Sequence, residues 1–377
     1  MIDLPLTPVS SNIDLPLAPV PSNKEPLPTV LDFGQEKLGL WLKERNYEPR
    51  YAQQIYHWVF SKRATSFSSM TTLSKSLREE LIRSFELFAL KPIVHQVSTD
   101  HTHKLLLETR DQRRIECVLI QENNRKTACI STQVGCGMGC VFCASGLKGV
   151  ERNLTSGEMI EQLIHLRNLT KPEERLTHIV VMGMGEPMAN LEALLEALDL
   201  AVSPSGLGIG SRHITISTVG LPAKIKQFAN LKKQYHLAVS LHAPNDILRT
   251  RIVPTNKGIG IANILEAADY FYAQTGRQVT YEYVLLGGIN DSKKEAHELA
   301  KLLYGRKAFI NLIPMNPVNE IGYLSPNSQT IEDFVRILRN SGLNINLRKR
   351  KGADIDAACG QLKQAYGMKQ ITEYHRL

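Results

Sequence analysis

The period of the apolar positions changes along the chain. Between residues 127 and 347, short apolar runs typical of buried strands alternate with longer runs of helical spacing. The strand-like runs are 128–132, 178–182, 213–218, 237–241, 280–285, 309–313 and 343–347, and the helix-like runs are 156–168, 191–202, 262–274 and 331–341. This alternation predicts an α/β fold with crossover connections and a parallel sheet, which a doubly wound sheet and a barrel both satisfy. In either fold, functional residues belong at the carboxyl ends of the strands.

The part of the chain before residue 127 follows two other patterns. Residues 35–90 have helical spacing and predict a small module of three short helices. Basic and aromatic side chains interleave there, which suits RNA but is equally typical of a half-buried helix face. Residues 104–109 and 113–120 then alternate like two strands around a hairpin turn. On the second strand, the alternation puts Glu116 and Cys117 on opposite faces.

The first thirty-two residues are rich in proline and nearly repeat themselves. Residues 2–12 are almost duplicated by residues 13–23, and seven prolines precede Phe33. Proline fixes φ and lacks a backbone donor, so we expect a disordered, partly polyproline extension here. The absence of arginine and the presence of aspartate argue against an organelle transit peptide.

Length and composition restrict the class of protein but do not identify it. A chain of 377 residues has room for one large domain, alone or with a small one. The net charge of +8 and the pI near 9.1 favour an anionic partner such as nucleic acid, although an ordinary basic surface gives the same balance. No apolar run reaches the length of a membrane span, so we expect no membrane partner. Six cysteines without a signal peptide fit a reducing, cytoplasmic location better than a disulfide framework.

Three of the cysteines stand in one loop. Cys136, Cys140 and Cys143 have the spacing CxxxCxxC, which lets three thiolates converge on one centre. Thiolates favour iron–sulfur clusters or zinc over hard cations. A structural zinc site normally has four protein ligands, whereas three cysteines on a [4Fe–4S] cluster leave one iron open to a substrate. Zinc with a distant fourth ligand and three buried core cysteines are the alternatives at this point.

Polar residues follow several predicted strands. The second strand of the parallel set leads into Gly183-Met184-Gly185-Glu186-Pro187, where glycines let a ligand approach the backbone beside a carboxylate able to accept from an ammonium group. Hydroxyl and amide groups after later strands suit ribose and carboxylate oxygens; they belong to Ser217, Ser240 and Asn316. His242 follows a strand as well, and a lone histidine of this kind is more often structural. Their joint placement favours a binding site.

Two further features lie near the end of the sequence. The basic run Arg348-Lys349-Arg350-Lys351 is either a solvated face or a site that attracts phosphates. Cys359 stands between small residues that keep its sulfur accessible, although a lone late cysteine is otherwise most often inert core.

Together these motifs resemble the RlmN-type radical S-adenosylmethionine (SAM) methyltransferases, which methylate carbon 2 of an adenine in 23S ribosomal RNA and in certain transfer RNAs. The resemblance covers roughly residue 38 onward. The matching stretches are 129–136, 152–155, 182–187, 240–246, 285–290 and 354–362. The resemblance implies a partial (β/α)6 barrel with a small N-terminal helical accessory domain. The predicted segments are the extension (1–32), the helical RNA-contact domain (33–95), a hairpin linker (96–126), the barrel (127–350) and a C-terminal segment carrying the methyl-carrier cysteine (351–377).

The resemblance also implies a mechanism that consumes two SAM molecules. One SAM methylates Cys359, and an external one-electron donor drives cleavage of a second to a 5′-deoxyadenosyl radical, which takes hydrogen from that methyl group. The resulting methylene radical adds to carbon 2 of the adenine. Glu116 then accepts a proton, and Cys129 releases the product by forming a disulfide with Cys359. The implied cluster ligands are Cys136, Cys140 and Cys143, and the implied SAM contacts are Gly185, Glu186, Ser217, Ser240, Leu241, His242 and Asn316.

Two alternatives stay open. A sibling family, resembling Cfr, methylates carbon 8 of the same ribosomal adenine and shares nearly every motif. Here residues 185–187 and 241–246 look more like the carbon-2 type. A non-enzymatic RNA-binding protein with a structural zinc is the second alternative. We expect a monomer that acts on 23S ribosomal RNA and transfer RNA.

Overall fold

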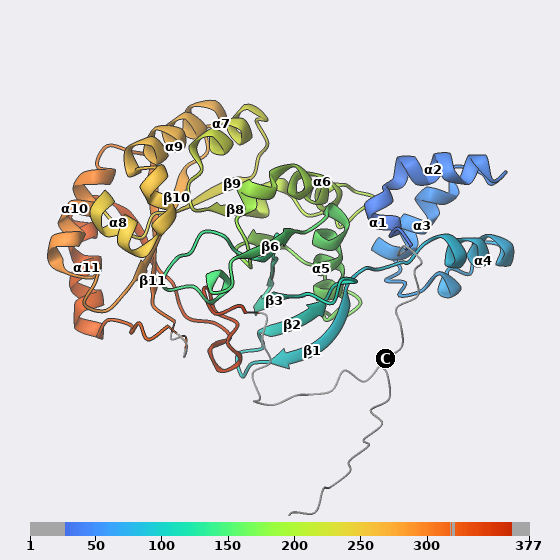
Figure 1. Ribbon diagram of the computed structural model, residues 1–377, viewed down its shortest axis with the longest axis horizontal. Coiled ribbons are helices and arrows are strands. Elements are labelled where there is room, and N and C mark those ends of the chain that lie inside the picture. Colours follow the sequence, from blue (N-terminus) through green and yellow to red (C-terminus); the bar gives the residue numbers. More distant parts are fainter. Residues whose placement is uncertain (1–26, 317, 319–320, 364–377) are drawn as a thin grey trace, which may run out of the picture.

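The computed structural model describes residues 27–316, 318 and 321–363 (Figure 1). Within these residues the largest sheet has ten strands, in the spatial order β1-β2-β3-β4-β7-β8-β9-β10-β11-β12. Neighbours from β1 to β4 are antiparallel, and neighbours from β4 to β12 are parallel. The strands are β1 Lys91–Val97, β2 His103–Glu108, β3 Arg114–Glu122, β4 Arg125–Cys129, β7 His178–Val181, β8 Ile214–Thr218, β9 His236–Ser240, β10 Val279–Leu285, β11 Ala308–Pro314 and β12 Asn344–Leu347.

Helices connect the parallel strands and form the outer layer of the barrel (Figure 1). They are α5 Ser156–Asn168, α6 Leu191–Val202, α7 Pro222–Asn230, α8 Asp246–Ile252, α9 Ile261–Thr275, α10 Lys293–Leu303 and α11 Ser328–Asn340. Each longer helix has an apolar face for the sheet; α11, for example, buries Phe334, Val335 and Leu338. The sequence also marks helix ends: Thr155 and Glu158 form a capping box at the start of α5, and Gly276 ends α9 in the left-handed conformation.

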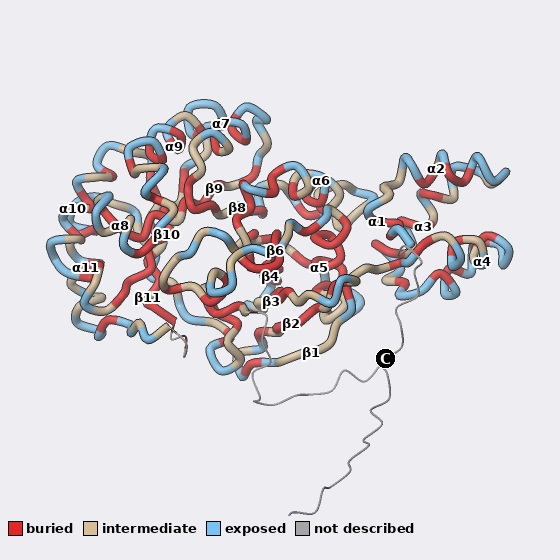
Figure 2. The backbone as a smooth tube through the Cα atoms, in the orientation of Figure 1, coloured by how far each residue is buried: buried red, intermediate tan, exposed pale blue. Residues whose placement is uncertain are grey.

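The sheet curls into an incomplete barrel. Six strand–helix units precede β12 in the described residues, and β1 and β12 are the edges of the sheet. Although β12 is six places from β4 in the sheet, the ammonium of Lys351, just after β12, lies 3.3 Å from a carboxylate oxygen of Glu122 at the end of β3. The α/β fold class and the partial (β/α)6 barrel are therefore confirmed. Buried residues follow the strands and the inner faces of the helices, while exposed residues lie outside (Figure 2).

The helical domain lies beside α5 (Figure 1). It contains α1 Val30–Phe33, α2 Gln35–Glu44, α3 Tyr51–Phe60 and α4 Lys75–Ser84. The barrel and the helical domain cover α5 on two sides, so most of its residues are buried, as Figure 2 shows.

The start of the helical domain falls inside the expected proline-rich extension. Residues 1–26 of that extension and residues 364–377 of the C-terminal segment lie outside the described residues. Just after Pro28, the N–H of Val30 donates to the carbonyl of Glu86 at 3.2 Å. Val30 and Leu31 are buried, so this short stretch belongs to the packed domain.

Several elements had too weak a pattern to be predicted. Strand β1 contains Pro92 and has an irregular register between Pro92 and Val94, which hides its alternation. The helices α7, α8 and α10 are short or have a narrow apolar face. In the part of the chain that the structure describes, no helix has both the length and the apolar character needed to cross a membrane.

Candidate active site

The cysteine loop is held closed by a small strand pair. Strands β5 Gln133–Gly135 and β6 Val150–Asn153 are antiparallel, and the N–H of Cys136 donates to the carbonyl of Gly149 at 2.8 Å. Gly135 has φ +77°, and a Cβ there would lie 2.1 Å from that same carbonyl oxygen. Only glycine fits such a position. The closure brings Cys136, Cys140 and Cys143 to the wall of one cavity, here named the cysteine-loop cavity.

Most of the predicted SAM contacts line the cysteine-loop cavity. The carboxyl ends of β7, β8 and β9 and the loop after β11 supply Gly185, Glu186, Ser217, Ser240, His242 and Asn316. Leu241 differs, because it is fully buried and does not line this cavity; its backbone N–H donates to the carbonyl of Glu282 at 3.0 Å.

Glu186 and His242 are both held firmly in the cavity wall. The two carboxylate oxygens of Glu186 accept from the N–H groups of Met188 at 3.0 Å and Val219 at 2.7 Å. Burial raises the pKa of this carboxyl group, while these donors oppose the shift. Nδ1 of His242 accepts from the N–H of Val284 at 3.1 Å, and burial lowers the pKa of His242 to about 3. The imidazole is therefore neutral, and it packs edge-on against Phe142.

Arg249 is a residue that the sequence did not single out. It is completely buried on α8, and its guanidinium donates to the carbonyls of Leu241 at 3.0 Å, Ser240 at 2.9 Å and Val219 at 2.6 Å. It thereby ties together the carboxyl ends of β8 and β9, where Ser217 and Ser240 face the cavity. An arginine in a short helix gives no signal of this role in the sequence.

The three loop thiols fit a metal centre chemically. Burial raises the pKa of Cys136 to about 11, and burial likewise raises the pKa values of Cys140 and Cys143. Buried thiolates therefore need a compensating positive charge, which a metal centre supplies. Among the described residues, no three His, Cys, Asp or Glu side chains are grouped tightly enough for a single metal ion.

The C-terminal segment closes the site from the other side. The N–H of Ala144, next to the last loop cysteine, donates to the carbonyl of Gly360 at 2.8 Å. The hydroxyl of Ser145 donates to the carbonyl of Leu362 at 2.8 Å, and the amide of Asn316 donates to the carbonyl of Cys359 at 3.0 Å. These three bonds fix Cys359 directly beside the cysteine loop.

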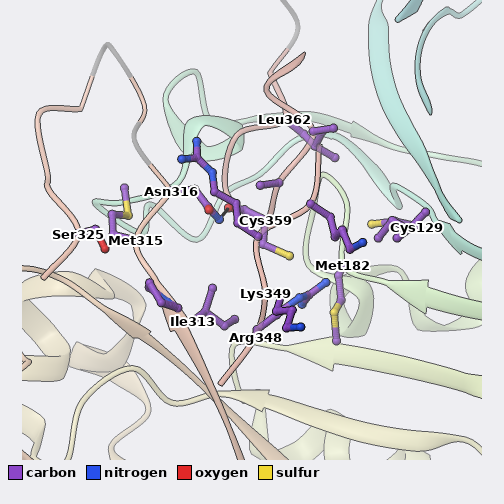
Figure 3. A pocket seen from close by; sticks show the side chains of 16 residues that line it. Cys129, Met182, Ile313, Met315, Asn316, Ser325, Arg348, Lys349, Cys359 and Leu362 are labelled. Atoms are coloured by element: carbon purple, nitrogen blue, oxygen red, sulfur yellow. Dashed lines mark hydrogen bonds between the residues drawn. The ribbon is translucent and has the colours of Figure 1, made fainter. Parts of the chain in front are cut away.

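Cys359 lines two cavities at once. One is the cysteine-loop cavity; the second, here named the basic cavity, is lined by Arg348, Lys349, Arg350 and Lys351 together with Cys129 and Cys359. Figure 3 shows Cys129 and Cys359 entering the basic cavity from two sides, with their sulfur atoms turned toward the space between them. All six cysteines are free thiols in this structure, so the expected pairing of Cys129 with Cys359 is absent from this state.

The remaining cysteines have contrasting surroundings. Burial raises the pKa of Cys129 to about 12, Cys359 adds to the rise, and the positive charge of Arg348 opposes it. Cys117, on β3, is completely buried and lines neither cavity. This agrees with its interpretation as a core residue.

Glu116 lies behind the C-terminal segment, outside the lining of both cavities. Its side chain is buried, with one oxygen 3.0 Å from the ammonium of Lys104 and the other accepting from the N–H of Lys363 at 2.6 Å. Burial raises the pKa of Glu116 to about 6, and Lys104 opposes the shift.

Comparisons with known proteins follow the same division of the chain. Residues 130–300 match the model of the radical SAM superfamily, and residues 29–87 match that of the ribosomal RNA large subunit methyltransferase N-terminal domain. A probable dual-specificity RNA methyltransferase RlmN from Rhodopirellula baltica is 49% identical, over 91% of this chain and 93% of that relative. The chain belongs to the RlmN family of dual-specificity RNA methyltransferases. The relative of the same name from Bacillus subtilis is 42% identical, over 89% of this chain and 93% of that relative.

A solved structure agrees with the RlmN assignment. The crystal structure of a radical SAM methyltransferase from Sphaerobacter thermophilus superposes with a TM-score of 0.87 and 40% identity, covering 90% of this chain and all of that one. The predicted family is thus confirmed, and this RlmN-type chain is a radical SAM methyltransferase rather than a non-enzymatic zinc protein. Enzymes of the radical SAM superfamily use a [4Fe–4S] cluster and SAM, which confirms the predicted cofactors.

Proposed function

We propose that this enzyme methylates carbon 2 of an adenine in 23S ribosomal RNA and in certain transfer RNAs, with Cys359 as the carrier of the methyl group. The observation that supports this most is the position of Cys359 in the walls of both cavities. A carrier must meet SAM on one side and the RNA base on the other. The name of the relatives, dual-specificity RNA methyltransferase, supports the choice of two RNA classes.

Cys136, Cys140 and Cys143 would hold the cluster in the cysteine-loop cavity. When bound, the cluster supplies the electron that cleaves SAM to a carbon radical, and an external one-electron donor replaces that electron. Glu186 faces this cavity and suits the ammonium group of SAM, although its two backbone donors already occupy one lone pair on each oxygen. Ser217, Ser240 and Asn316 offer hydroxyl and amide groups for the ribose and carboxylate, and neutral His242 shapes the wall.

A carrier is needed because adenine carbon 2 is not nucleophilic. The thiolate of Cys359 attacks the methyl carbon of SAM; a bond from that carbon to the Cys359 sulfur forms, the bond to the sulfonium sulfur breaks, and S-adenosylhomocysteine leaves. The methylated sulfur then presents its carbon to the basic cavity, where an adenine has room beside Cys129 and Met182. The cations from Arg348 to Lys351 surround this cavity and attract the phosphates that flank the base.

Glu116 and Cys129 complete the proposed reaction. Glu116 accepts the proton from carbon 2, and a pKa near 6 leaves it largely ionised at neutral pH. To reach the substrate it must exchange its bond to Lys363, so the C-terminal segment has to shift during turnover. The thiolate of Cys129 attacks the sulfur of Cys359 in the adduct, so that a disulfide forms and the bond from this sulfur to the methylene carbon breaks. The methylene carbon takes up a proton and leaves as the methyl group of the base. A cytoplasmic location would keep both thiols reduced between turnovers.

The test is methylation of RNA that lacks the modification. The enzyme is reconstituted with iron and sulfide under anaerobic conditions, supplied with SAM and a reductant, and the RNA is digested and its adenines are separated by mass and retention time. The proposal predicts 2-methyladenine with the unmodified enzyme and none with Cys359→Ala. Formation of 8-methyladenine would instead support the Cfr-like reaction, and undiminished product with Cys359→Ala would refute the carrier role.

A further inference from the structure

Six basic side chains form a row at the end of the sheet that faces away from both cavities. We name it the amino-end row: Arg125, His178, Arg212, His213, His236 and Arg277. They stand at or just before the first residues of β4, β7, β8, β9 and β10. The cavities lie at the carboxyl ends of the same parallel strands, so the row has no part in the site already described.

The side chains of the row contact one another. Nδ1 of His213 lies 3.0 Å from Nε2 of His178, and the two rings meet edge to face. The other nitrogen of His178 lies 2.9 Å from the hydroxyl of Thr177. Further along, the guanidinium of Arg277 lies 2.6 Å from Nε2 of His236. The row is therefore an ordered polar array at the protein surface, in which the guanidinium groups are donors.

In the residues that the structure describes, no carboxylate neutralises the row. Among the described residues, none of its six members forms an ion pair with aspartate or glutamate. Nε of Arg277 is buried without a hydrogen-bond partner. Burial, Arg125 and His213 lower the pKa of His178 to about 4, and burial and Arg212 lower the pKa of Arg277. Because burial keeps the imidazole of His178 neutral, the positive charge of the row comes from its arginines, and an anion would compensate that charge.

The length of the row favours a chain of phosphates over a single anion. It crosses five neighbouring strands, and strands in a sheet lie about 4.8 Å apart, so it extends over roughly 19 Å. A free phosphate or pyrophosphate is much shorter. A nucleic-acid backbone offers repeated negative charges over this distance.

The helical domain is joined to one end of the row. The guanidinium of Arg63 donates to the carbonyls of Thr170 at 2.8 Å, Lys171 at 3.0 Å and Glu174 at 2.8 Å. This stretch leads directly into β7, which begins at His178. RNA that contacts the helical domain would therefore meet the row next.

We infer that the amino-end row binds the sugar–phosphate backbone of the RNA substrate at a distance from the target adenine. This rests on the proposed function, since it names a second contact for the same substrate. A short RNA hairpin would fill only the basic cavity, whereas a long transcript would also reach the row.

The test compares two RNAs with the reconstituted holoenzyme. Binding of a domain-length 23S transcript and of a short hairpin with the same adenine is measured by fluorescence anisotropy over a salt series. The variant R212A/R277A is expected to bind the long transcript roughly tenfold more weakly and to reduce its salt slope by about 2. Hairpin binding and the hairpin methylation rate should not change.

Matched variants decide the outcome. K224A/K294A removes half-buried Lys224 from α7 and exposed Lys294 from α10 and should behave like the unmodified enzyme, and R212K/R277K should retain long-transcript binding. Should R212A/R277A misfold in thermal melts, R212E tests the same point, because Arg212 is exposed. Equal long-transcript affinity and salt slope in the row variants and in K224A/K294A would overturn the inference. If R212A/R277A binds the long transcript more weakly but the unmodified enzyme methylates neither RNA, the proposed function alone is refuted.

Discussion

Two buried carboxylates attach two parts of the chain to the barrel in different ways. Glu161, on α5, accepts from the N–H groups of Ala89 at 2.8 Å and Leu90 at 2.7 Å, where the chain leaves the helical domain. Glu116, on β3, accepts from the N–H of Lys363 in the C-terminal segment at 2.6 Å. Both side chains are almost completely buried, yet within the described part of the chain only Glu116 of the two has a cation in contact, the ammonium of Lys104 at 3.0 Å.

The difference distinguishes a permanent attachment, made by Glu161, from one that can open during turnover, made by Glu116. Burial raises the pKa of Glu161 to about 8, and further bonds surround it: Arg167 donates to the carbonyls of Val59 and Phe60, and Asp32 accepts from the N–H of Gly157. The pKa of Glu116 is about 6, since Lys104 offsets part of the burial. A carboxylate that keeps its charge and holds one backbone N–H can exchange that N–H for a substrate.

The largest expected effect is on activity, and it arises in the C-terminal segment that Glu116 holds. Cys359→Ala should abolish methylated adenine while leaving the melting temperature within about 1–2 °C, since a half-exposed thiol contributes little packing. Mass analysis of digested RNA and a thermal melt measure the two quantities. Cys117→Ala is the matched control: it removes a buried thiol outside both cavities and should lower stability without abolishing product. Loss of methylated adenine in both variants would contradict a specific role for Cys359.

At the attachment of the helical domain, Glu161→Ala should mainly affect stability. It leaves the N–H groups of Ala89 and Leu90 without their acceptor, at a cost of roughly 1–3 kcal/mol each. Urea unfolding measures the change. Activity per folded molecule should stay close to that of the unmodified enzyme, and a fully stable but inactive variant would show that Glu161 acts in the reaction instead.

The ion pair of Glu116 predicts a shift in pH dependence. If Glu116 is the base, the rate should fall as pH drops through about 6, where the carboxylate becomes protonated. Lys104→Met removes the cation that lowers this pKa, so the acid limb of the rate profile should move to higher pH. The pH–rate profiles of both enzymes test this; Lys126→Met, which breaks an ion pair with Glu174 away from the site, is the control. An unmoved limb would exclude Glu116 as the titrating group.

A further effect concerns stability against pH. The pKa of Glu161 is raised from 4.5 to about 8 in the fold, so the folded state binds more protons between these values. Stability from this group is therefore complete below pH 4.5 and is lost as pH rises toward 8, at no more than about 1.4 kcal/mol per pH unit. Glu161→Gln should flatten that part of the stability curve in urea titrations at several pH values. A curve identical to that of the unmodified enzyme would mean that Glu161 is already ionised in the fold.

The sequence predicted the repeating part of the molecule well. Strands with unbroken apolar runs, such as β7 and β9, lie close to the expected positions, and the CxxxCxxC spacing and the glycines before Glu186 marked the cysteine-loop cavity. These features depend on neighbours along the chain. The contacts of Arg249, the bond between Glu116 and Lys363, and the position of Cys359 between two cavities depend on residues far apart in sequence, which no local pattern encodes.

The most direct test of the account asks whether Cys359 meets the adenine while Cys129 stands ready beside it. Cys129→Ala removes the thiol that would release the product, so the adenine should stay covalently attached to the sulfur of Cys359 through a methylene bridge. Nuclease and protease digestion followed by mass spectrometry would locate this adduct. We predict an adenine adduct on Cys359 in Cys129→Ala and none in the double variant C129A/C359A. Free 2-methyladenine at the usual rate from Cys129→Ala, with no adduct, would contradict the account.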